Sequence, residues 1–308
     1  MKTINVLMTT YNGEKYLKEQ IDSIFAQDCI AKGLADVRLL IRDDKSTDST
    51  VDIINDYVRR YTDKITLIKG ENIGVIKGFF TLLKECERAD YYAFSDQDDY
   101  WMPNKLSVAI ENIDSFSNGM PYLYSSSVTI ADAQLNPIES SIDRSSIRAS
   151  FENAMLENVV YGCTAVFNHN LREIVTVEYP NYTYMHDWWM YLTATAFGRH
   201  YYDEQSYMKY RQHEDNAVGN ATDKLTEAKA RSKNYGKSKD KLSKQLTEFV
   251  RIYEERFPAN DKIEKAKYFL AAKKSFVKRI GIKKKLGLYR QRTGDDKLFA
   301  VLLLLGKY

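Results

Sequence analysis

The chain contains only three cysteines among its 308 residues, and they lie far apart at Cys29, Cys86 and Cys163. An odd number of dispersed cysteines argues against a disulfide framework and against a zinc site, and it favours a reducing compartment. The first residues enter a strand-like run at once and turn polar too soon for a signal peptide. We therefore expect a cytoplasmic protein.

Long apolar runs are absent as well, and we find no internal repeat. The longest apolar run, Leu298 to Leu305, has eight residues, whereas a helix that spans a bilayer needs about 20. The composition nevertheless supports a substantial core, because 44% of the residues are hydrophobic and 13% are aromatic. A chain of 308 residues fits one large domain or one domain with an appendage.

The net charge of +3 hides an uneven distribution of charge. Residues 1–221 hold 21 lysines and arginines against 32 aspartates and glutamates, whereas residues 222–292 hold 22 against 8. Such asymmetry suggests two functions along one chain. We expect an acidic domain over residues 1–221 and a basic helical region over residues 222–308.

Strand and helix patterns alternate through the first hundred residues. Strands are predicted at 4–8, 37–41, 65–68 and 91–95, and helices at 14–27, 46–61 and 75–86. This order predicts an α/β fold with a mostly parallel sheet and right-handed crossovers. Further along the chain we expect a helix at 103–116, a strand at 122–130, a turn that leads into an apolar strand over 161–167, a helix at 184–197 and a strand at 207–210, with a polar loop over 131–150.

Polar clusters follow each of the first four strands, and the fourth cluster is the most unusual. Asp96, Asp98 and Asp99 place three carboxylates within four positions at the end of a buried strand. Like charges this close repel and resist desolvation, whereas a divalent cation such as Mg²⁺ or Mn²⁺ would bind them together with phosphate oxygens. Ligands of open α/β sheets also bind at the carboxyl ends of strands. The alternative is a solvated acidic turn.

In their order along the chain, these clusters resemble the signature of family 2 glycosyltransferases with the GT-A fold. They are Thr9-Thr10-Tyr11-Asn12-Gly13, Asp43-Asp44-x-Ser46-x-Asp48-x-Thr50, Asn72-x-Gly74 and Asp96-x-Asp98-Asp99. The resemblance covers residues 1–220. Two later motifs, His186-Asp187-Trp188-Trp189 and Tyr210-Arg211-Gln212-His213, resemble bacterial polysaccharide rhamnosyltransferases of the same family.

The resemblance implies an inverting transfer from a nucleotide-sugar donor, with Mn²⁺ or Mg²⁺ as cofactor. Asp98 and His213 would bind the cation, and Asp96 would meet the ribose or a metal-bound water. Asp187 matches the general base, which deprotonates the acceptor hydroxyl. The remaining donor-binding candidates, for the nucleoside, the diphosphate and the pocket wall, are Thr10, Tyr11, Asp43, Asp44, Lys77, Trp101 and His186.

Structural roles stay open for several of these residues. Asp48 fits helix capping better than ligand binding, Lys77 could be an exposed helix lysine, and Asp187 could be a plain N-cap. Trp188 and Trp189 could stack on a sugar or belong to the core. We interpret Cys163 as a small buried residue near the acceptor side, not as a nucleophile.

The basic region admits three interpretations: a solvated helical appendage, a nucleic-acid-binding tail, or a segment that docks on an anionic membrane. The acidic domain argues against nucleic acid. The implied acceptors are often lipid-linked, which favours the membrane, with residues 276–285 and 298–305 as a surface-bound patch; homo-oligomerisation stays open.

The full hypothesis is a peripheral rhamnosyltransferase on the cytoplasmic face of the membrane, moving L-rhamnose from dTDP-L-rhamnose to a saccharide acceptor in cell-wall polysaccharide synthesis. The alternatives are a UDP-hexose or UDP-N-acetylhexosamine donor and a catalytically inactive nucleotide-sugar binder.

Overall fold

A computed structural model describes residues 1–138, 147–213 and 240–308 of the chain. Within these residues, eight strands form one sheet in the order β3-β2-β1-β4-β7-β6-β8-β5. The strands are β1 (Lys2–Thr10), β2 (Ala35–Asp43), β3 (Ile65–Lys69), β4 (Tyr91–Ser95), β5 (Tyr100–Trp101), β6 (Tyr122–Ala131), β7 (Val166–Asn168) and β8 (Arg199–Arg211). The first four strands are parallel to one another, β7 runs antiparallel between β4 and β6, and β8 is parallel to β6.

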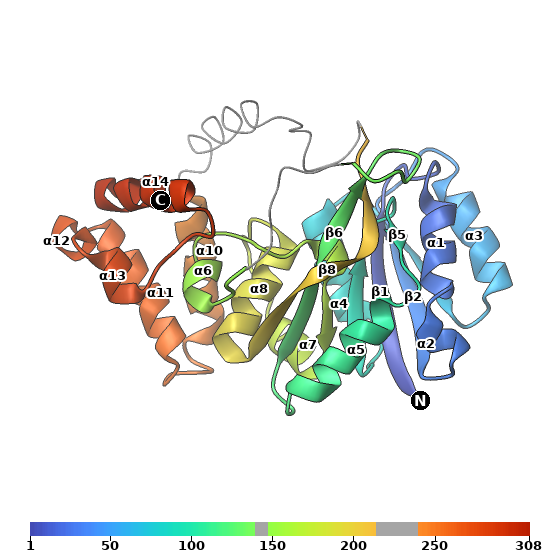
Figure 1. The fold of residues 1–308 in the computed structure, drawn as a ribbon, viewed down its shortest axis with the longest axis horizontal. Coiled ribbons are helices and arrows are strands. Elements are labelled where there is room, and N and C mark those ends of the chain that lie inside the picture. Colours follow the sequence, from blue (N-terminus) through green and yellow to red (C-terminus); the bar gives the residue numbers. More distant parts are fainter. Residues whose placement is uncertain (139–146, 214–239) are drawn as a thin grey trace.

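Helices cover both faces of this sheet (Figure 1). They are α1 (Leu17–Phe25), α2 (Asp28–Ala31), α3 (Thr50–Arg60), α4 (Val75–Glu85), α5 (Lys105–Phe116), α6 (Phe151–Ala154), α7 (His169–Val175) and α8 (His186–Phe197). Side chains alternate between the faces along β1: Val6 packs in the core with α1, α3 and α5, whereas Leu7 packs with α4 and α8. Both faces are therefore buried, and the open positions for ligands lie at the strand ends.

The basic region forms helices at one end of the long axis, opposite α3 (Figure 1). They are α10 (Lys241–Tyr253), α11 (Asp261–Lys273), α12 (Phe276–Arg279), α13 (Ile282–Leu286) and α14 (Thr293–Leu305). Trp189 of α8 stacks on Tyr253 of α10 with ring centroids 6.1 Å apart, and Phe197 lies 5.8 Å from Phe249. The region thus shares one hydrophobic core with the sheet.

The predicted mostly parallel sheet is confirmed, and several element boundaries differ from expectation; α3, for example, begins at Thr50 and not at 46. The helix expected over 14–27 is shorter: α1 ends at Phe25, because Gln27 is extended and its side chain bonds Met102 O (2.8 Å) and the N–H of Leu106 (2.9 Å), and the separate short helix α2 follows. The strand expected over 207–210 is the end of the longer β8, which pairs with β6 although its middle is exposed and polar.

Two of the predicted segments are described only in part. The loop expected over 131–150 includes residues 139–146, and the helical pattern expected from 222 includes residues 222–239, which lie outside the described ranges. Among the helices of the described ranges, none combines the length and the apolar character that crossing a membrane requires.

Candidate functional site

The loops after β1 and β2 are joined by side-chain hydrogen bonds at the carboxyl end of the sheet. Thr10 donates its hydroxyl to Oδ1 of Asp43 (3.0 Å), and Ser46 donates its backbone N–H to Oδ2 (2.9 Å). Asp48 accepts the N–H groups of Glu14 and Thr50, both at 3.0 Å. The buried Asp43 carboxylate is therefore fixed beside Thr10, and Asp48 has the capping contacts that its position predicts.

Asp44 points away from Asp43 and fixes the third strand-end loop. Its buried carboxylate forms an ion pair with Arg42 and accepts the N–H groups of Ile73 (3.2 Å) and Gly74 (2.8 Å). Gly74 has φ +79°, a backbone conformation that favours glycine. These contacts explain the glycine of the Asn72-x-Gly74 motif structurally, and they occupy much of the hydrogen-bonding capacity of Asp44.

Gln97 connects the first and fourth strand-end loops, a role that the sequence did not reveal. Its side-chain oxygen accepts the N–H of Tyr11 (2.9 Å), and its amide donates to Tyr11 O (3.1 Å). A Cβ at Gly13 would lie 2.3 Å from this oxygen, so a larger residue there would displace the Gln97 amide. The Tyr11 ring remains half-exposed at the edge of the site, and Lys77 lies in the first turn of α4.

The three carboxylates after β4 differ in exposure and in partners. Oδ2 of Asp98 lies 2.8 Å from Nε2 of His213, and the Asp98 side chain is 18% exposed. Oδ1 of the fully buried Asp99 accepts the N–H of Arg211 (3.2 Å), whereas its Oδ2 is buried without a hydrogen-bond partner. Asp96 is partly exposed. The end of β8 therefore closes over the acidic loop.

Arg211 is the second functional residue that the sequence did not reveal, although it stands in the motif with His213. Its guanidinium is buried, donates from Nε to Asp98 O (2.7 Å) and forms an ion pair with Glu19. It also lies over the Tyr16 ring, 4.3 Å from the centroid. Arg211 thereby fixes the backbone of the acidic loop. Its side chain points inward, and only the tertiary structure defines that orientation.

The pKa shifts around the acidic loop indicate that its carboxylates have too little positive charge beside them. Burial, followed by the Asp98 and Asp187 carboxylates, raises the pKa of Asp96 to about 7. Burial, followed by Asp98 and Asp96, raises the pKa of Asp99 well above its usual range. Burial also lowers the pKa of Lys105, at the start of α5, to about 7, while Cys163 and Asp99 oppose that shift. A bound cation would relieve this imbalance.

The side chains present fit a divalent cation. Adjacent ligands of an octahedral Mg²⁺ or Mn²⁺, with bonds of about 2.1 Å, lie roughly 3 Å apart, close to the 2.8 Å between Asp98 Oδ2 and His213 Nε2. Ligand atoms of Asp96, Asp99 and Cys163 also lie within 4.8 Å of one another. The orphaned Asp99 oxygen adds an acceptor to the same loop.

Asp187 is the second residue of α8 and lies near the acidic loop, since its charge raises the pKa of Asp96. It is buried and accepts the N–H of Trp188 (2.6 Å). Burial raises the pKa of Asp187 to about 6, against the lowering effects of the Trp188 N–H, the Asn158 side chain and the Gly162 N–H. The N-cap of α8 is Met185, so Asp187 is not a plain N-cap.

Four aromatic side chains of the predicted motifs lie in the packing around the site, all of them buried: Trp101, His186, Trp188 and Trp189. The His186 ring stacks on Phe79 with centroids 4.0 Å apart, and burial lowers the pKa of His186 to about 3, so the ring is neutral. A Cβ at Gly162 would lie 3.0 Å from Nε2 of His186. The donor contacts expected of Trp101 and His186 stay predictions.

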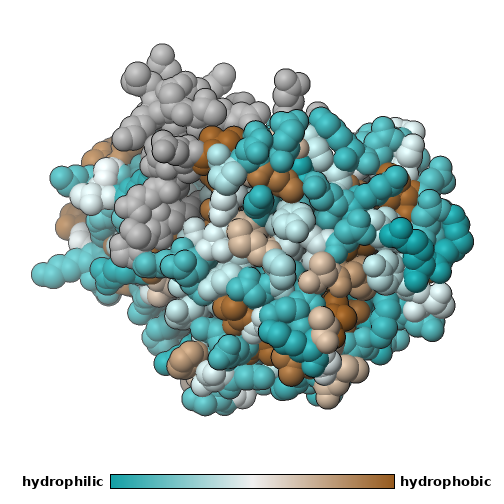
Figure 2. Space-filling model, turned by 45° about the vertical axis from the view of Figure 1, so that its right-hand side comes forward, coloured by the Kyte–Doolittle hydropathy of each residue, from teal (hydrophilic) through white to brown (hydrophobic). Residues whose placement is uncertain are grey.

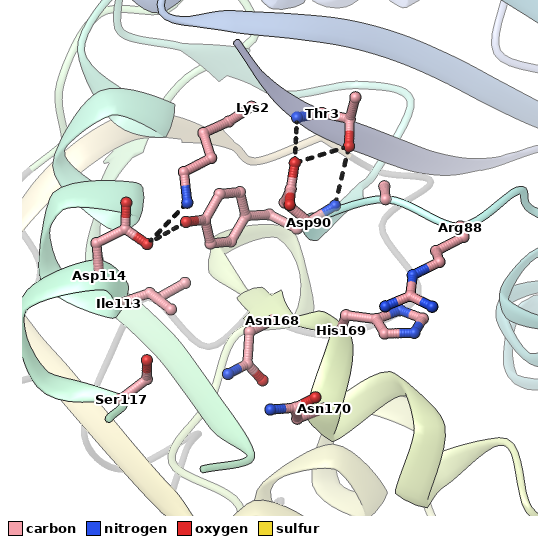
Figure 3. A pocket seen from close by; sticks show the side chains of 12 residues that line it. Lys2, Thr3, Arg88, Asp90, Ile113, Asp114, Ser117, Asn168, His169 and Asn170 are labelled. Atoms are coloured by element: carbon pink, nitrogen blue, oxygen red, sulfur yellow. Dashed lines mark hydrogen bonds and ion pairs between the residues drawn. The ribbon is translucent and has the colours of Figure 1, made fainter. Parts of the chain in front are cut away.

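A second hollow, of about 400 Å³, lies at the opposite edge of the sheet, where β1 and β4 begin (Figure 3). Both of its carboxylates already have partners. Asp90 accepts the N–H and the hydroxyl of Thr3 (2.8 and 3.0 Å), and Lys2 lies 3.5 Å from Asp114 (Figure 3). This hollow therefore lacks the uncompensated negative charge that marks the acidic loop.

Several known proteins are similar to this chain in sequence or in fold. The dTDP-rhamnosyl transferase RfbG of Shigella flexneri is 30% identical over 227 residues, which cover 69% of this chain and 73% of that protein. S. aureus TarS 1-349 in complex with UDP-GlcNAc aligns over 95% of this chain and 93% of its own, with a TM-score of 0.55 and 15% identity. The mannosyltransferase PcManGT from Pyrobaculum calidifontis in complex with GDP-Man and Mn²⁺ aligns over 99% and 85%, with a TM-score of 0.53 and 16% identity.

These alignments confirm the predicted GT-A fold. The family model described as "Glycosyl transferase family 2" matches residues 5–176, which is more than half of the chain. This segment contains β1 to β4 and the polar cluster at the end of each. The chain therefore belongs to glycosyl transferase family 2.

Proposed function

We propose that this glycosyltransferase is an inverting, metal-dependent rhamnosyltransferase, which moves L-rhamnose from dTDP-L-rhamnose to a lipid-linked saccharide of a cell-wall polysaccharide. The observation that carries the proposal is the grouping of Asp96, Asp98 and His213 in one loop cluster, with the buried Asp187 close enough to perturb Asp96. The similarity to a dTDP-rhamnosyl transferase supports the choice of donor.

The donor nucleoside would bind where the β1 and β2 loops meet. The Asp43 carboxylate, fixed by Thr10 and Ser46, can accept the imide N–H of a pyrimidine base, and the half-exposed Tyr11 ring can cover that base. Lys77 would approach the diphosphate. Thymine and uracil present the same imide edge, so a UDP-hexose or UDP-N-acetylhexosamine donor is the alternative within this class.

Asp98 and His213 would hold a divalent cation, with Asp96 acting through the ribose or a metal-bound water. When bound, the cation would stabilise the negative charge that develops on the departing nucleoside diphosphate. An imidazole ligand favours Mn²⁺ over Mg²⁺. Asp99, which accepts from Arg211, would keep the loop in place.

Asp187 would act as the general base. Its carboxylate would take the proton of the acceptor hydroxyl while that oxygen forms a bond to the anomeric carbon, and the bond from this carbon to the diphosphate would break on the opposite face. A pKa of about 6 leaves the carboxylate ionised at neutral pH and makes it a stronger base than an exposed aspartate.

The C-terminal region would dock on an anionic membrane, where a lipid-linked acceptor is held. Seven large apolar side chains are exposed on the neighbouring helices α12 and α14 and the residue after α12: Phe276, Val277, Ile280, Leu298, Val301, Leu304 and Leu305. Elsewhere exposed apolar residues are more scattered, as on the face that carries α1 and α3 (Figure 2). Such a density of apolar surface is typical of an interaction face.

Charge and placement support the membrane as the partner of this face. Lys278 and Arg279 lie on α12, and Lys284 and Lys285 lie on α13, which contacts α14. Each basic residue near anionic lipid contributes about 1 kcal/mol. Helix α14 lies at the same edge of the molecule as the carboxyl ends of the parallel strands (Figure 1). We therefore propose that residues 1–221 catalyse and residues 222–308 dock, with a second copy of the chain as the alternative partner.

A donor screen tests the proposed function. Full-length protein is incubated with dTDP-L-rhamnose, UDP-glucose, UDP-N-acetylglucosamine or GDP-mannose, with Mn²⁺ or with EDTA, and release of nucleoside diphosphate is measured. We expect Mn²⁺-dependent release with dTDP-L-rhamnose as the preferred donor. Preference for a UDP-sugar would replace the donor assignment, and equal release in EDTA would overturn the metal-dependent mechanism.

A further inference from the structure

A hollow of about 740 Å³ is lined by the segment that leads into α6, by α11, and by α13 with the residues after it. The charged side chains in its wall are four cations and one carboxylate: Arg148, Lys265, Lys284, Lys285 and Glu152. The carboxylate is already in use, because Glu152 forms an ion pair with Lys265. A hollow of this size with an excess of positive charge is typical of a site for an anionic ligand.

Three cations of the wall are not neutralised by the chain. Among the residues that the structure describes, no ion pair is formed by Arg148, Lys284 or Lys285. The adjacent Lys283 shows the difference, since it forms an ion pair with Asp296. Like charges that gather without counter-charge repel one another, and an anion in the hollow would relieve that repulsion.

Aromatic rings hold two of these cations in place without neutralising them. The Arg148 guanidinium lies over the Tyr289 ring, 4.9 Å from its centroid. Nζ of Lys285 lies 3.9 Å from the centroid of the Tyr268 ring. A cation–π contact fixes the position of a cation and leaves N–H donors free for a ligand. The wall therefore presents donors at fixed places.

Hydrogen bonds join the two sides of the hollow. Asn153 of α6 donates from Nδ2 to Tyr289 O (3.2 Å), and the Tyr289 hydroxyl donates to Arg148 O (2.8 Å). The N–H of Arg148 donates to Oε1 of Gln291 (3.1 Å). The backbone that carries the cations is thus fixed before any ligand binds, which lowers the entropy lost on binding.

Helix α6 connects this hollow to the proposed base. Ser150 and Glu152, at the start of α6, line the hollow, whereas Ala154, at its end, accepts the indole N–H of Trp188 (2.7 Å). Trp188 follows Asp187 in the chain and donates its N–H to that carboxylate (2.6 Å). Helix α6 has four residues and is therefore about 6 Å long. The hollow thus lies close to the segment that would receive the acceptor.

We propose that this hollow binds a phosphate group, and that its ligand is the phosphate or diphosphate that links a saccharide acceptor to its lipid. Phosphate binding stands alone, whereas this identification of the ligand rests on the proposed function. Lys284 and Lys285 bind phosphate oxygens from α13, and Arg148 binds them from the opposite wall. The site is separate from the acidic loop, whose residues 96–99 do not line it.

Calorimetric titration of the full-length protein with inorganic pyrophosphate in EDTA tests the phosphate site. We expect the wild type to bind pyrophosphate. Lys284→Gln combined with Lys285→Gln should weaken the affinity by about tenfold or more, because two charge-assisted contacts are lost. Arg148→Gln, on the other wall, should weaken it by about fivefold.

Lys274→Gln combined with Lys297→Gln is the matched control. It removes the same charge from two exposed lysines of the same region that do not line the hollow. We expect it to change the affinity by less than about twofold, since contacts are kept and only long-range attraction is reduced. A wild type that does not bind pyrophosphate, or equal weakening by the two pairs of substitutions, would overturn the proposal.

Vesicles distinguish the lipid-linked diphosphate from the headgroup of an anionic phospholipid. Co-sedimentation compares phosphatidylcholine vesicles that contain farnesyl diphosphate with vesicles of equal charge that contain phosphatidylglycerol. Tighter binding to farnesyl diphosphate that is lost in the Lys284→Gln and Lys285→Gln variant supports the assigned ligand, whereas equal binding to both vesicles overturns it. Failure of the donor screen would refute the proposed function and leave the pyrophosphate result standing, because that titration requires neither metal nor sugar transfer.

Discussion

Nε2 of His213 lies 2.8 Å from Oδ2 of Asp98, although 115 positions separate the two residues in the chain. The His213 ring also packs against Tyr16, with ring centroids 5.0 Å apart. The fold therefore brings together at one point Tyr16, which precedes α1, the acidic loop and the end of β8. The proposed metal site can therefore be tested by substituting either residue of this contact.

Substitution at either side of this contact should remove metal-dependent activity. We expect His213→Ala and Asp98→Asn each to lower the rate of transfer by roughly 100-fold or more and to weaken Mn²⁺ binding, since each would remove one ligand. EDTA should abolish transfer by the wild type, and added Mn²⁺ should restore it. Electron paramagnetic resonance of Mn²⁺ measures the binding directly.

His169→Ala is the matched control, because His169 lies in the hollow at the opposite edge of the sheet. It should leave Mn²⁺ binding and the transfer rate close to wild type. Unchanged Mn²⁺ affinity in both His213→Ala and Asp98→Asn would contradict the proposed ligand set.

The pH dependence of transfer should report Asp187. A base must be ionised to accept a proton, and burial raises the pKa of Asp187 to about 6. Activity should therefore be present above this pH and fall as the pH drops through about 6. Asp187→Asn should lower kcat by about 10²- to 10⁴-fold and remove that limb of the profile. A kcat that is independent of pH between 5 and 8 in the wild type would argue against this base.

We expect Asp44 to act mainly as a structural residue, so its substitution should first be tested by its effect on stability. Asp44→Asn breaks its buried ion pair with Arg42 and weakens the hold on Gly74, so we expect the free energy of unfolding to fall by about 3 kcal/mol. Urea denaturation measures this change. Asp52→Asn, on the exposed side of α3, should stay within about 0.5 kcal/mol of wild type. A stable Asp44→Asn variant that has lost only donor affinity would show instead that Asp44 serves the nucleoside.

The apolar face of α12 and α14 should control membrane binding. In co-sedimentation with vesicles of phosphatidylcholine and phosphatidylglycerol, Val277→Asp and Leu305→Asp together should weaken binding at least tenfold, about the effect of removing one buried apolar side chain or more. Phe116→Asp, equally exposed on α5, should have no effect. If the full-length wild type does not bind such vesicles at low salt, the membrane proposal is wrong. If the wild type self-associates with rising concentration and the double variant does not, a second copy of the chain is the favoured partner.

Much of the fold could be predicted because local patterns and global topology agree. The alternation of strand and helix patterns indicated the parallel sheet, and the polar residues at positions 10, 43 and 96 marked the ends of β1, β2 and β4 correctly. The end of the sheet that carries the site followed from this order alone. Elements fixed by distant contacts were harder, as at Gln27, whose bonds to Met102 and Leu106 interrupt a helical pattern.

Residues of the site could be predicted from the sequence only where the residue type itself indicates a chemical role. Clustered aspartates indicated a cation, but the supporting residues carry no local signal. Gln97 is an ordinary amide and Arg211 an ordinary cation in the sequence, and their roles arise from hydrogen bonds that span 86 and 113 positions. Burial likewise places His186 against Phe79, which no sequence spacing indicated.

The most direct test of the account is transfer by wild type and Asp187→Asn with dTDP-L-rhamnose, Mn²⁺ and a lipid-linked saccharide acceptor, followed by nuclear magnetic resonance of the product anomer. We predict transfer by the wild type with inversion at the anomeric carbon, and loss of transfer in Asp187→Asn with Mn²⁺ binding retained. Full transfer by Asp187→Asn, or a product that retains the donor configuration, would contradict the account.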